Sequence, residues 1–252
     1  MTASQPTHRI PEQLDPKTIG LFLDVDGTLL DIAPCPEMVE VGNGLIDDLA
    51  SAQEALGGAL ALISGRPIVE LDRLFAPLRL AASGVHGAET RHRPDCDVIS
   101  VGGSLGVDAW SDLCDLLRQF PGSYAENKRV SFAVHYPVPG TDIRHLEQAL
   151  AGFRERLAKP DASLRLLAGR GVFELQLDGF DKGRAIERFM AAAPFRGRRP
   201  IFVADDEIDR PAFDATLALG GLAFSVGGEL PALSGAFEGP AAVRAWLHEL
   251  GR

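Results

Sequence analysis

The sequence predicts an α/β fold, a doubly wound, Rossmann-like parallel sheet interrupted by an inserted α+β block. Short apolar runs that end abruptly in polar residues are typical of buried parallel strands. Amphipathic helical segments alternate with these runs towards both ends of the chain, which is the rhythm of a doubly wound sheet. In the middle of the chain, strand-like runs come in close pairs, as in antiparallel hairpins. We therefore expect the middle to form a unit of its own.

The first buried run, residues 18–23, ends in acidic residues and glycine, as a strand and its exit loop would. Residues 43–56 have helical spacing, and the run 59–63 is a second strand that ends at Ser64-Gly65-Arg66-Pro67. The rest of the parallel part keeps this rhythm. It comprises a helix to about residue 75, a strand over 78–82 and, after the insertion, a helix over 183–193, a strand over 200–204, a helix over 211–219, a strand over 223–226 and a helix over 240–250.

The inserted block is expected over residues 104–179, between two core segments, 1–103 and 180–252. Its pattern is helix, hairpin, helix, hairpin. The predicted elements are a helix over 108–120, strands over 124–127 and 130–136, a helix over 142–157, and strands over 164–168 and 172–177. Glycines at 169 and 171 suit the turn of the second hairpin.

Composition narrows the class of partner. The 252 residues carry a formal charge of −10, which repels phosphate backbones and argues against nucleic acid, although a small phosphorylated ligand remains possible. Cys35, Cys96 and Cys114 are far apart and indicate neither a disulfide framework nor a zinc site. Residues 1–13 lack the apolar core of a signal peptide, and no apolar run is long enough to cross a membrane. We expect a cytoplasmic monomer.

Two acidic groups follow predicted strands. Asp24-Val25-Asp26-Gly27-Thr28 comes after the first strand, and Asp205, Asp206 and Asp209 follow the strand over 200–204. Ligands of open α/β sheets bind beyond the carboxyl ends of the strands, so both groups should face one crevice. Alone, the first could be an acidic turn and the second a solvated helix N-terminus. Together they favour a site of hard oxygen ligands, which suits Mg²⁺.

Two further residues admit both a structural and a functional interpretation. Ser64 precedes a helix with Pro67 in its first turn, where a hydroxyl can cap the helix or donate to phosphate. Lys182 stands at the start of a helix, a position that the macrodipole disfavours for a cation. This placement suggests an anionic group nearby, although surface lysines are common.

In this order, the four pieces resemble the haloacid-dehalogenase superfamily of phosphatases, with D-x-D-G-T as the specific motif. The resemblance implies that Asp24 is the nucleophile and forms an aspartyl-phosphate, and that Asp26 is the general acid and base. It implies Mg²⁺ held by Asp24, the Asp26 backbone carbonyl and Asp205. The other implied residues are Gly27 beside the ligand, Ser64 and Lys182 on the phosphate oxygens, and Asp206 and Asp209 orienting metal-bound water and Lys182.

Further segments are similar to the trehalose-6-phosphate phosphatase family: 62–66, 84–89, 126–128, 134–136, 172–174 and 220–227. This resemblance implies a cap in which Glu126, Lys128 and Glu174 bind sugar hydroxyls; alone, they would pass for exposed hairpin charges. His86 would line the sugar pocket, and Arg66 would brace the phosphate or an acidic partner. The fourth motif departs from the family's usual G-D-D-x-T-D-E at Ala204, Ile208 and Arg210, and Leu175-Gln176 replaces an arginine-proline pair.

The expected function is therefore Mg²⁺-dependent hydrolysis of trehalose 6-phosphate. Two alternatives stay open at this point. One is a related phosphatase for another sugar phosphate, such as sucrose phosphate or a mannosyl-phosphoglycerate. The other is a regulatory protein that binds a phosphorylated sugar without turning it over.

Overall fold

The computed structural model describes residues 14–33, 38–157, 163–169 and 171–252, and it divides the chain into two compact units. The first unit takes its described residues from Met1–Ile99 and Lys182–Arg252, and the second is Ser100–Asp181. Cys35 and residues 1–13 lie outside the described residues, so what we expect of them stays a prediction. Within the described ranges, no helix has the length and apolar character needed to cross a membrane.

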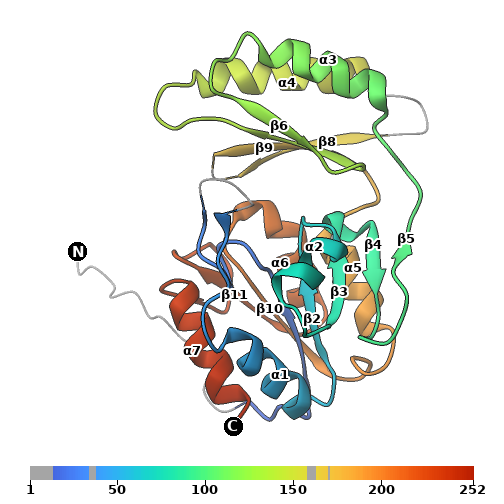
Figure 1. Ribbon diagram of the computed structural model, residues 1–252, viewed down its shortest axis with the longest axis vertical. Coiled ribbons are helices and arrows are strands. Elements are labelled where there is room, and N and C mark those ends of the chain that lie inside the picture. Colours follow the sequence, from blue (N-terminus) through green and yellow to red (C-terminus); the bar gives the residue numbers. More distant parts are fainter. Residues whose placement is uncertain (1–13, 34–37, 158–162, 170) are drawn as a thin grey trace. The chain divides into compact units, whose positions relative to one another are not determined.

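The first unit is built on an eight-stranded sheet in the order β12-β11-β10-β1-β2-β3-β4-β5 (Figure 1). Neighbouring strands from β12 to β3 run parallel, and β4 pairs with β3 antiparallel. The strands are β1 (Ile19–Leu23), β2 (Leu60–Ile63), β3 (Ala81–Gly84), β4 (Glu89–Arg91), β5 (Ile99–Ser100), β10 (Arg199–Ala204), β11 (Leu222–Val226) and β12 (Gly235–Phe237). This sheet confirms the doubly wound prediction.

Helices cover both faces of this sheet because its central strands are apolar on both sides. In β1, Leu21 and Leu23 pack on the face with α1, α2 and α7, whereas Phe22 packs on the face with α5 and α6. The helices are α1 (Leu45–Ala55), α2 (Ile68–Leu74), α5 (Lys182–Met190), α6 (Arg210–Ala218) and α7 (Pro240–Leu250). Two short 3₁₀ turns, η2 (Val85–Gly87) and η3 (Glu207–Asp209), lie in loops that follow strands.

The second unit is an antiparallel sheet in the order β6-β7-β9-β8, covered on one face by α3 and α4 (Figure 1). Its strands are β6 (Tyr124–Asn127), β7 (Ser131–His135), β8 (Leu164–Gly169) and β9 (Val172–Leu177), and its helices are α3 (Val107–Leu117) and α4 (Ile143–Leu157). Phe132 and Leu175 are among the residues that pack on the helices. The two predicted hairpins therefore exist, and β7–β9 pairing joins them into one sheet.

The differences from the predicted elements fall on short or weakly apolar strands. The strand expected over 78–82 is β3, Ala81–Gly84, because the backbone of Leu78 is still hydrogen-bonded in a turn to Phe75 (N–O 2.8 Å). Three short strands at the two ends of the sheet order, β4, β5 and β12, were not predicted; each has only two or three residues, too few to show an alternation of apolar and polar residues.

Candidate active site

The carboxyl ends of the central strands bring the predicted core residues together. β1 pairs with β10 and β2 in parallel, with Leu23 opposite Val203 and Leu62. Asp24, Ser64 and Asp205 directly follow these three strands, so they emerge at the same edge of the sheet. The backbone N–H of Asp24 donates to the carbonyl of Val203 at 3.0 Å and extends the β1–β10 pairing to the nucleophile candidate.

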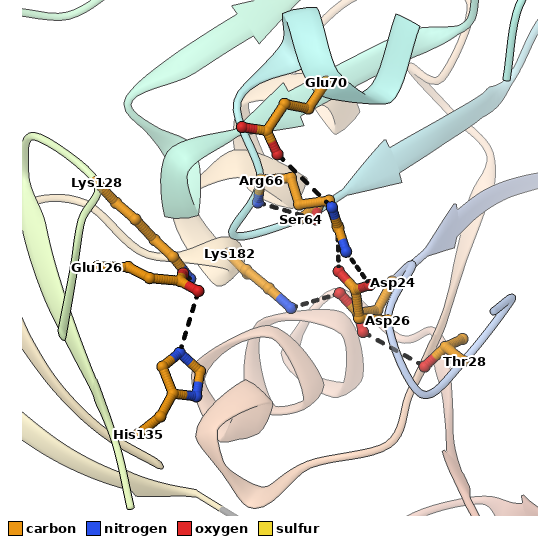
Figure 2. A network of polar contacts seen from close by, with 10 residues as sticks. All are labelled: Asp24, Asp26, Thr28, Ser64, Arg66, Glu70, Glu126, Lys128, His135 and Lys182. Atoms are coloured by element: carbon orange, nitrogen blue, oxygen red, sulfur yellow. Dashed lines mark hydrogen bonds and ion pairs between the residues drawn. The ribbon is translucent and has the colours of Figure 1, made fainter. Parts of the chain in front are cut away.

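Lys182 lies between two buried carboxylates (Figure 2 draws the contact with Asp24). Its Nζ is 2.6 Å from Asp24 Oδ1 and 2.6 Å from Asp209 Oδ1. This lysine is the first residue of α5, and the anionic neighbours explain a cation at a position that the helix dipole disfavours. Burial lowers the pKa of Lys182, but attraction by Asp209 and Asp24 outweighs burial and raises that pKa above its ordinary value.

Burial shifts the pKa values of the two carboxylates in the same direction. Burial raises the pKa of Asp24 to about 7, although attraction by Lys182 lowers it, and repulsion from Asp209 and Asp26 adds to the rise. Burial likewise raises the pKa of Asp209 to about 6, against attraction by Lys182. One buried cation is therefore not enough to hold both groups fully ionised at neutral pH. A second cation would relieve the remaining repulsion.

The acidic cluster fits such a cation. Asp24, Asp205 and Asp209 each offer a carboxylate oxygen, and these oxygens all lie within 4.8 Å of one another. Hard oxygen donors at this spacing suit Mg²⁺. Gly27 keeps the cluster compact, since a Cβ at this left-handed position (φ 76°) would collide with the carboxylate of Asp205. Asp209, which was expected to help orient metal-bound water and Lys182, joins the two predicted carboxylates of Asp24 and Asp205 in this cluster, whereas the side chain of Asp26 faces a different partner.

That partner is Arg66, which holds Asp26 in a bidentate ion pair (Figure 2). The two distances are 2.7 Å from Nε to Oδ2 and 2.8 Å from Nη2 to Oδ1. Arg66 also lies 3.6 Å from Glu70 on α2. Of the two interpretations of Arg66, the geometry favours the acidic partner. The Asp26 side chain is 40% exposed, so this carboxylate is the accessible one of the D-x-D pair.

The loop after β2 is tightly braced. Ser64 Oγ accepts a hydrogen bond from the Arg66 backbone N–H at 3.1 Å, a local turn role rather than a cap on α2. His86 lies against this loop, because a Cβ on Gly65 would come within 2.6 Å of its Nε2. Val85 and His86 both have positive φ (48° and 51°), an uncommon conformation for a β-branched residue. The strain indicates that the surroundings hold His86 in this position.

Of the predicted sugar-binding residues, Glu126, Lys128 and Glu174 belong to the second unit, and the two glutamates share one face of its sheet. Glu126 of β6 is opposite Ala133 of β7, which is opposite Glu174 of β9. The Cα atoms of the two glutamates are therefore about 10 Å apart, which is two strand spacings. Lys128 Nζ lies 3.7 Å from Glu126 Oε2, so the two predicted residues form an ion pair.

The fourth motif keeps a compact local structure despite its departures from the family pattern. Asp206 Oδ1 accepts a hydrogen bond from the N–H of Ile208 at 3.1 Å and caps the 3₁₀ turn. Arg210 forms a bidentate pair with Glu207, both distances being 2.9 Å, and donates to the carbonyl of Pro231 at 3.1 Å. The arginine thus binds its own loop rather than the acidic cluster.

Four residues near these groups were not singled out from the sequence. Thr28 Oγ1 donates to Asp24 Oδ2 at 3.4 Å, and its place in D-x-D-G-T was the available signal. Glu70, four residues after Arg66 in the sequence, forms an ion pair with it: Glu70 Oε2 lies 3.6 Å from Arg66 Nη1. Glu89 accepts from the N–H of Ile68 at the start of α2 (2.9 Å), a contact between residues far apart in sequence. His135 Nε2 lies 3.4 Å from Glu126 Oε1, and the two residues are on the two strands of one hairpin.

Solved structures share this architecture at low sequence identity. A phosphatase of the haloalkanoate (HAD) enzyme superfamily from Bacteroides thetaiotaomicron is 15% identical, with a TM-score of 0.61 over 97% of this chain and 99% of that one. The C-terminal domain of C. albicans trehalose-6-phosphate phosphatase is 18% identical, with a TM-score of 0.79 over 93% of both chains. The chain therefore has the fold of the haloacid-dehalogenase phosphatases.

Sequence comparison is more specific. The family model for trehalose-phosphatase matches residues 22–227. Trehalose-6-phosphate phosphatase of Escherichia coli (strain K12) is 36% identical over 227 residues, which cover 90% of this chain and 84% of that protein. The chain belongs to the trehalose-phosphatase family, as its motifs predicted.

Proposed function

We propose that this protein hydrolyses trehalose 6-phosphate to trehalose and phosphate through an aspartyl-phosphate on Asp24. Family membership supports the substrate. The observation that carries the mechanism is the buried contact of Lys182 with Asp24, 2.6 Å long, at the edge where Asp205 and Asp209 complete an acidic cluster. This arrangement keeps a carboxylate oxygen beside a fixed positive charge, where a phosphate dianion can be bound and attacked.

In this mechanism each residue near the cluster has a separate task. Asp24 attacks phosphorus, and Lys182 and Ser64 stabilise negative charge on the other phosphate oxygens. Asp26 protonates the leaving sugar oxygen and later takes a proton from the attacking water. Arg66 positions Asp26 through its bidentate pair. Because both carboxylate oxygens of Asp26 bond to Arg66, the pair must open before Asp26 can pass a proton to the sugar oxygen.

The carboxylates of Asp24, Asp205 and Asp209, with the Asp26 backbone carbonyl, would hold Mg²⁺. When bound, the ion supplies positive charge that offsets repulsion between the cluster and the phosphate. Asp206 and Asp209 support this arrangement by fixing the loop after β10 and by orienting Lys182. His86 fixes the loop of Ser64, which lies at the same edge of the sheet.

Mg²⁺ should stabilise the folded protein more at high pH than at low pH. The pKa values of Asp24 and Asp209 are raised to about 7 and about 6, so at about pH 6 the ion must displace protons that are absent at about pH 8. Without metal, the free energy of unfolding changes with pH in the opposite direction. Folding then favours the protonated carboxyl groups, and their contribution to stability is lost as pH rises through these pKa values. Melting curves with Mg²⁺ and with EDTA at both pH values measure the difference; an equal shift at both would contradict the metal site.

Replacing Glu126, Lys128 or Glu174 by alanine should cost activity on the sugar substrate alone. Each loss leaves polar groups of the bound sugar unpaired, which we expect to cost roughly 2–4 kcal/mol of transition-state binding. Activity on p-nitrophenyl phosphate, which has no sugar, should stay near normal. Equal losses on both substrates would indicate a role in stability instead, and no loss on either would indicate solvated charges. Glu147→Ala on an exposed face of α4 is the matched control.

Phosphate release from a panel of sugar phosphates tests the proposed function directly. The panel contains trehalose 6-phosphate, sucrose phosphate, a mannosyl-phosphoglycerate and glucose 6-phosphate, each with Mg²⁺ and with EDTA. We expect trehalose 6-phosphate to have the highest kcat/KM and EDTA to stop release. A higher value for another member would reassign the substrate. Binding without release from any member would favour the regulatory alternative.

A further inference from the structure

The sheet of the second unit has two chemically different faces. Side chains alternate between the faces along each strand. On the face that packs on α3 and α4, the central strands place Phe132, Val134, Phe173 and Leu175, all of which are buried. The opposite face carries polar side chains, two rings and the apolar residues Ala133, Leu167 and Val172. A face that combines polar groups with rings is the kind of surface that binds a sugar, which has both hydroxyls and C–H groups.

The two rings belong to Tyr124 and His135, which are directly opposite each other on β6 and β7. Their ring centroids are 4.8 Å apart and their planes differ by 17°, so the rings stack. Tyr124 is 45% exposed although it is a large aromatic residue. A cross-strand pair of this kind stabilises a hairpin, but that role alone does not require an exposed ring.

The ring pair adjoins the predicted hydroxyl-binding residues. His135 Nε2 lies 3.4 Å from Glu126 Oε1, the contact drawn in Figure 2. Tyr124 and Glu126 are two residues apart on β6 and therefore lie on the same face. The next row on this face is Glu126, Ala133 and Glu174, with the small, fully buried Ala133 between the two carboxylates. The rings and the two carboxylates thus occupy adjacent rows on the same face of the sheet.

We propose that Tyr124, supported from behind by the stacked ring of His135, forms a stacking platform for a pyranose ring of the sugar phosphate, and that His135 also positions Glu126. This inference rests on the proposed function and adds two residues to the sugar-binding set. The C–H groups on one face of a pyranose carry partial positive charge, which the negative face of an aromatic ring attracts. Glu126 and Glu174 can accept hydrogen bonds from the hydroxyls at the edge of the same ring.

Binding of trehalose 6-phosphate to the Asp24→Asn protein, measured by titration calorimetry with Mg²⁺ present, tests the platform without turnover. We expect Tyr124→Leu and His135→Leu to raise Kd about three- to tenfold, the range of aromatic stacking. Tyr124→Phe and His135→Phe keep the rings; we expect the first to restore Kd and the second to restore it in part, since the contact with Glu126 is lost. Inorganic phosphate, which has no ring, should bind the Leu variants as it binds the parent.

Ile143→Ala, a change at an exposed position of α4, is the control for general effects on this unit. An unchanged Kd in both Leu variants, or an equal rise for inorganic phosphate, would overturn the platform. A lower melting temperature with unchanged Kd would show that the rings serve hairpin stability only. Binding of trehalose 6-phosphate that depends on Tyr124, in a parent enzyme that does not hydrolyse it, would refute the proposed function and keep the platform.

Discussion

Asp24→Asn is expected to lower kcat on trehalose 6-phosphate by about three or more powers of ten, because the amide lacks the nucleophilic oxygen. The shape of the side chain is retained, and its amide oxygen can still accept from Lys182, which now donates to Asp24 Oδ1 at 2.6 Å. The amide NH2 would take the place of Asp24 Oδ2, 3.4 Å from the Thr28 hydroxyl, and can donate to that oxygen. The fold should therefore persist. Initial rates with Mg²⁺, together with a melting curve, measure both effects.

Asp214→Asn is the matched control, since Asp214 is an exposed residue of α6 that no proposed role involves. It should keep the activity of the parent protein. An Asp24→Asn protein that keeps activity within about tenfold of the parent would rule out Asp24 as the nucleophile. A variant that fails to fold would be recognised from its melting curve, and Asp24→Glu, which keeps the charge but displaces the oxygen, would then take its place.

Lys182→Met is expected to lower kcat by about 10²–10³, the usual effect of removing one group that stabilises transition-state charge. Methionine fills a similar volume without the ammonium that lies 2.6 Å from both Asp24 and Asp209. The loss also leaves two buried carboxylates without their shared cation. Their pKa values should rise further, so the folded variant should gain stability as pH falls towards the acid range.

Lys17→Met removes an exposed lysine of the same unit and serves as the control. Rates on trehalose 6-phosphate and melting temperatures at acid and neutral pH should match those of the parent. A Lys182→Met protein with parental kcat would mean that the lysine stabilises the carboxylates and takes no part in the reaction. A pH–stability curve unchanged from the parent would contradict the electrostatic coupling of the three groups.

The fold and the core of the site could be predicted because both depend on local patterns. Asp24 and Asp205 each follow a buried apolar run, and parallel strands bring their carboxyl ends to one edge. The position of Lys182 at a helix start was itself an electrostatic signal, and Asp24 and Asp209 are the anions it indicated. Such inferences need only the spacing of apolar residues along the sequence and the signs of the charged side chains.

Pairings between residues far apart in sequence could not be predicted in the same way. The bidentate contact of Arg66 with Asp26 depends on the angles at which two loops leave neighbouring strands. The row of Glu126, Ala133 and Glu174 depends on the register of β7 against β9, which no turn between those strands sets. The positive φ of Val85 is rare for a β-branched residue, so propensity would predict a different backbone there.

Chemical trapping of the phosphoenzyme shows which residue carries the phosphoryl group during turnover. The protein is mixed with trehalose 6-phosphate labelled in its phosphate group, quenched in acid at a series of early times, digested and analysed by mass spectrometry. We expect a label on the peptide that contains Asp24, removable by hydroxylamine as an acyl phosphate is, and absent from Asp24→Asn. Turnover with the label on another residue, or with the same labelling in Asp24→Asn, would contradict it.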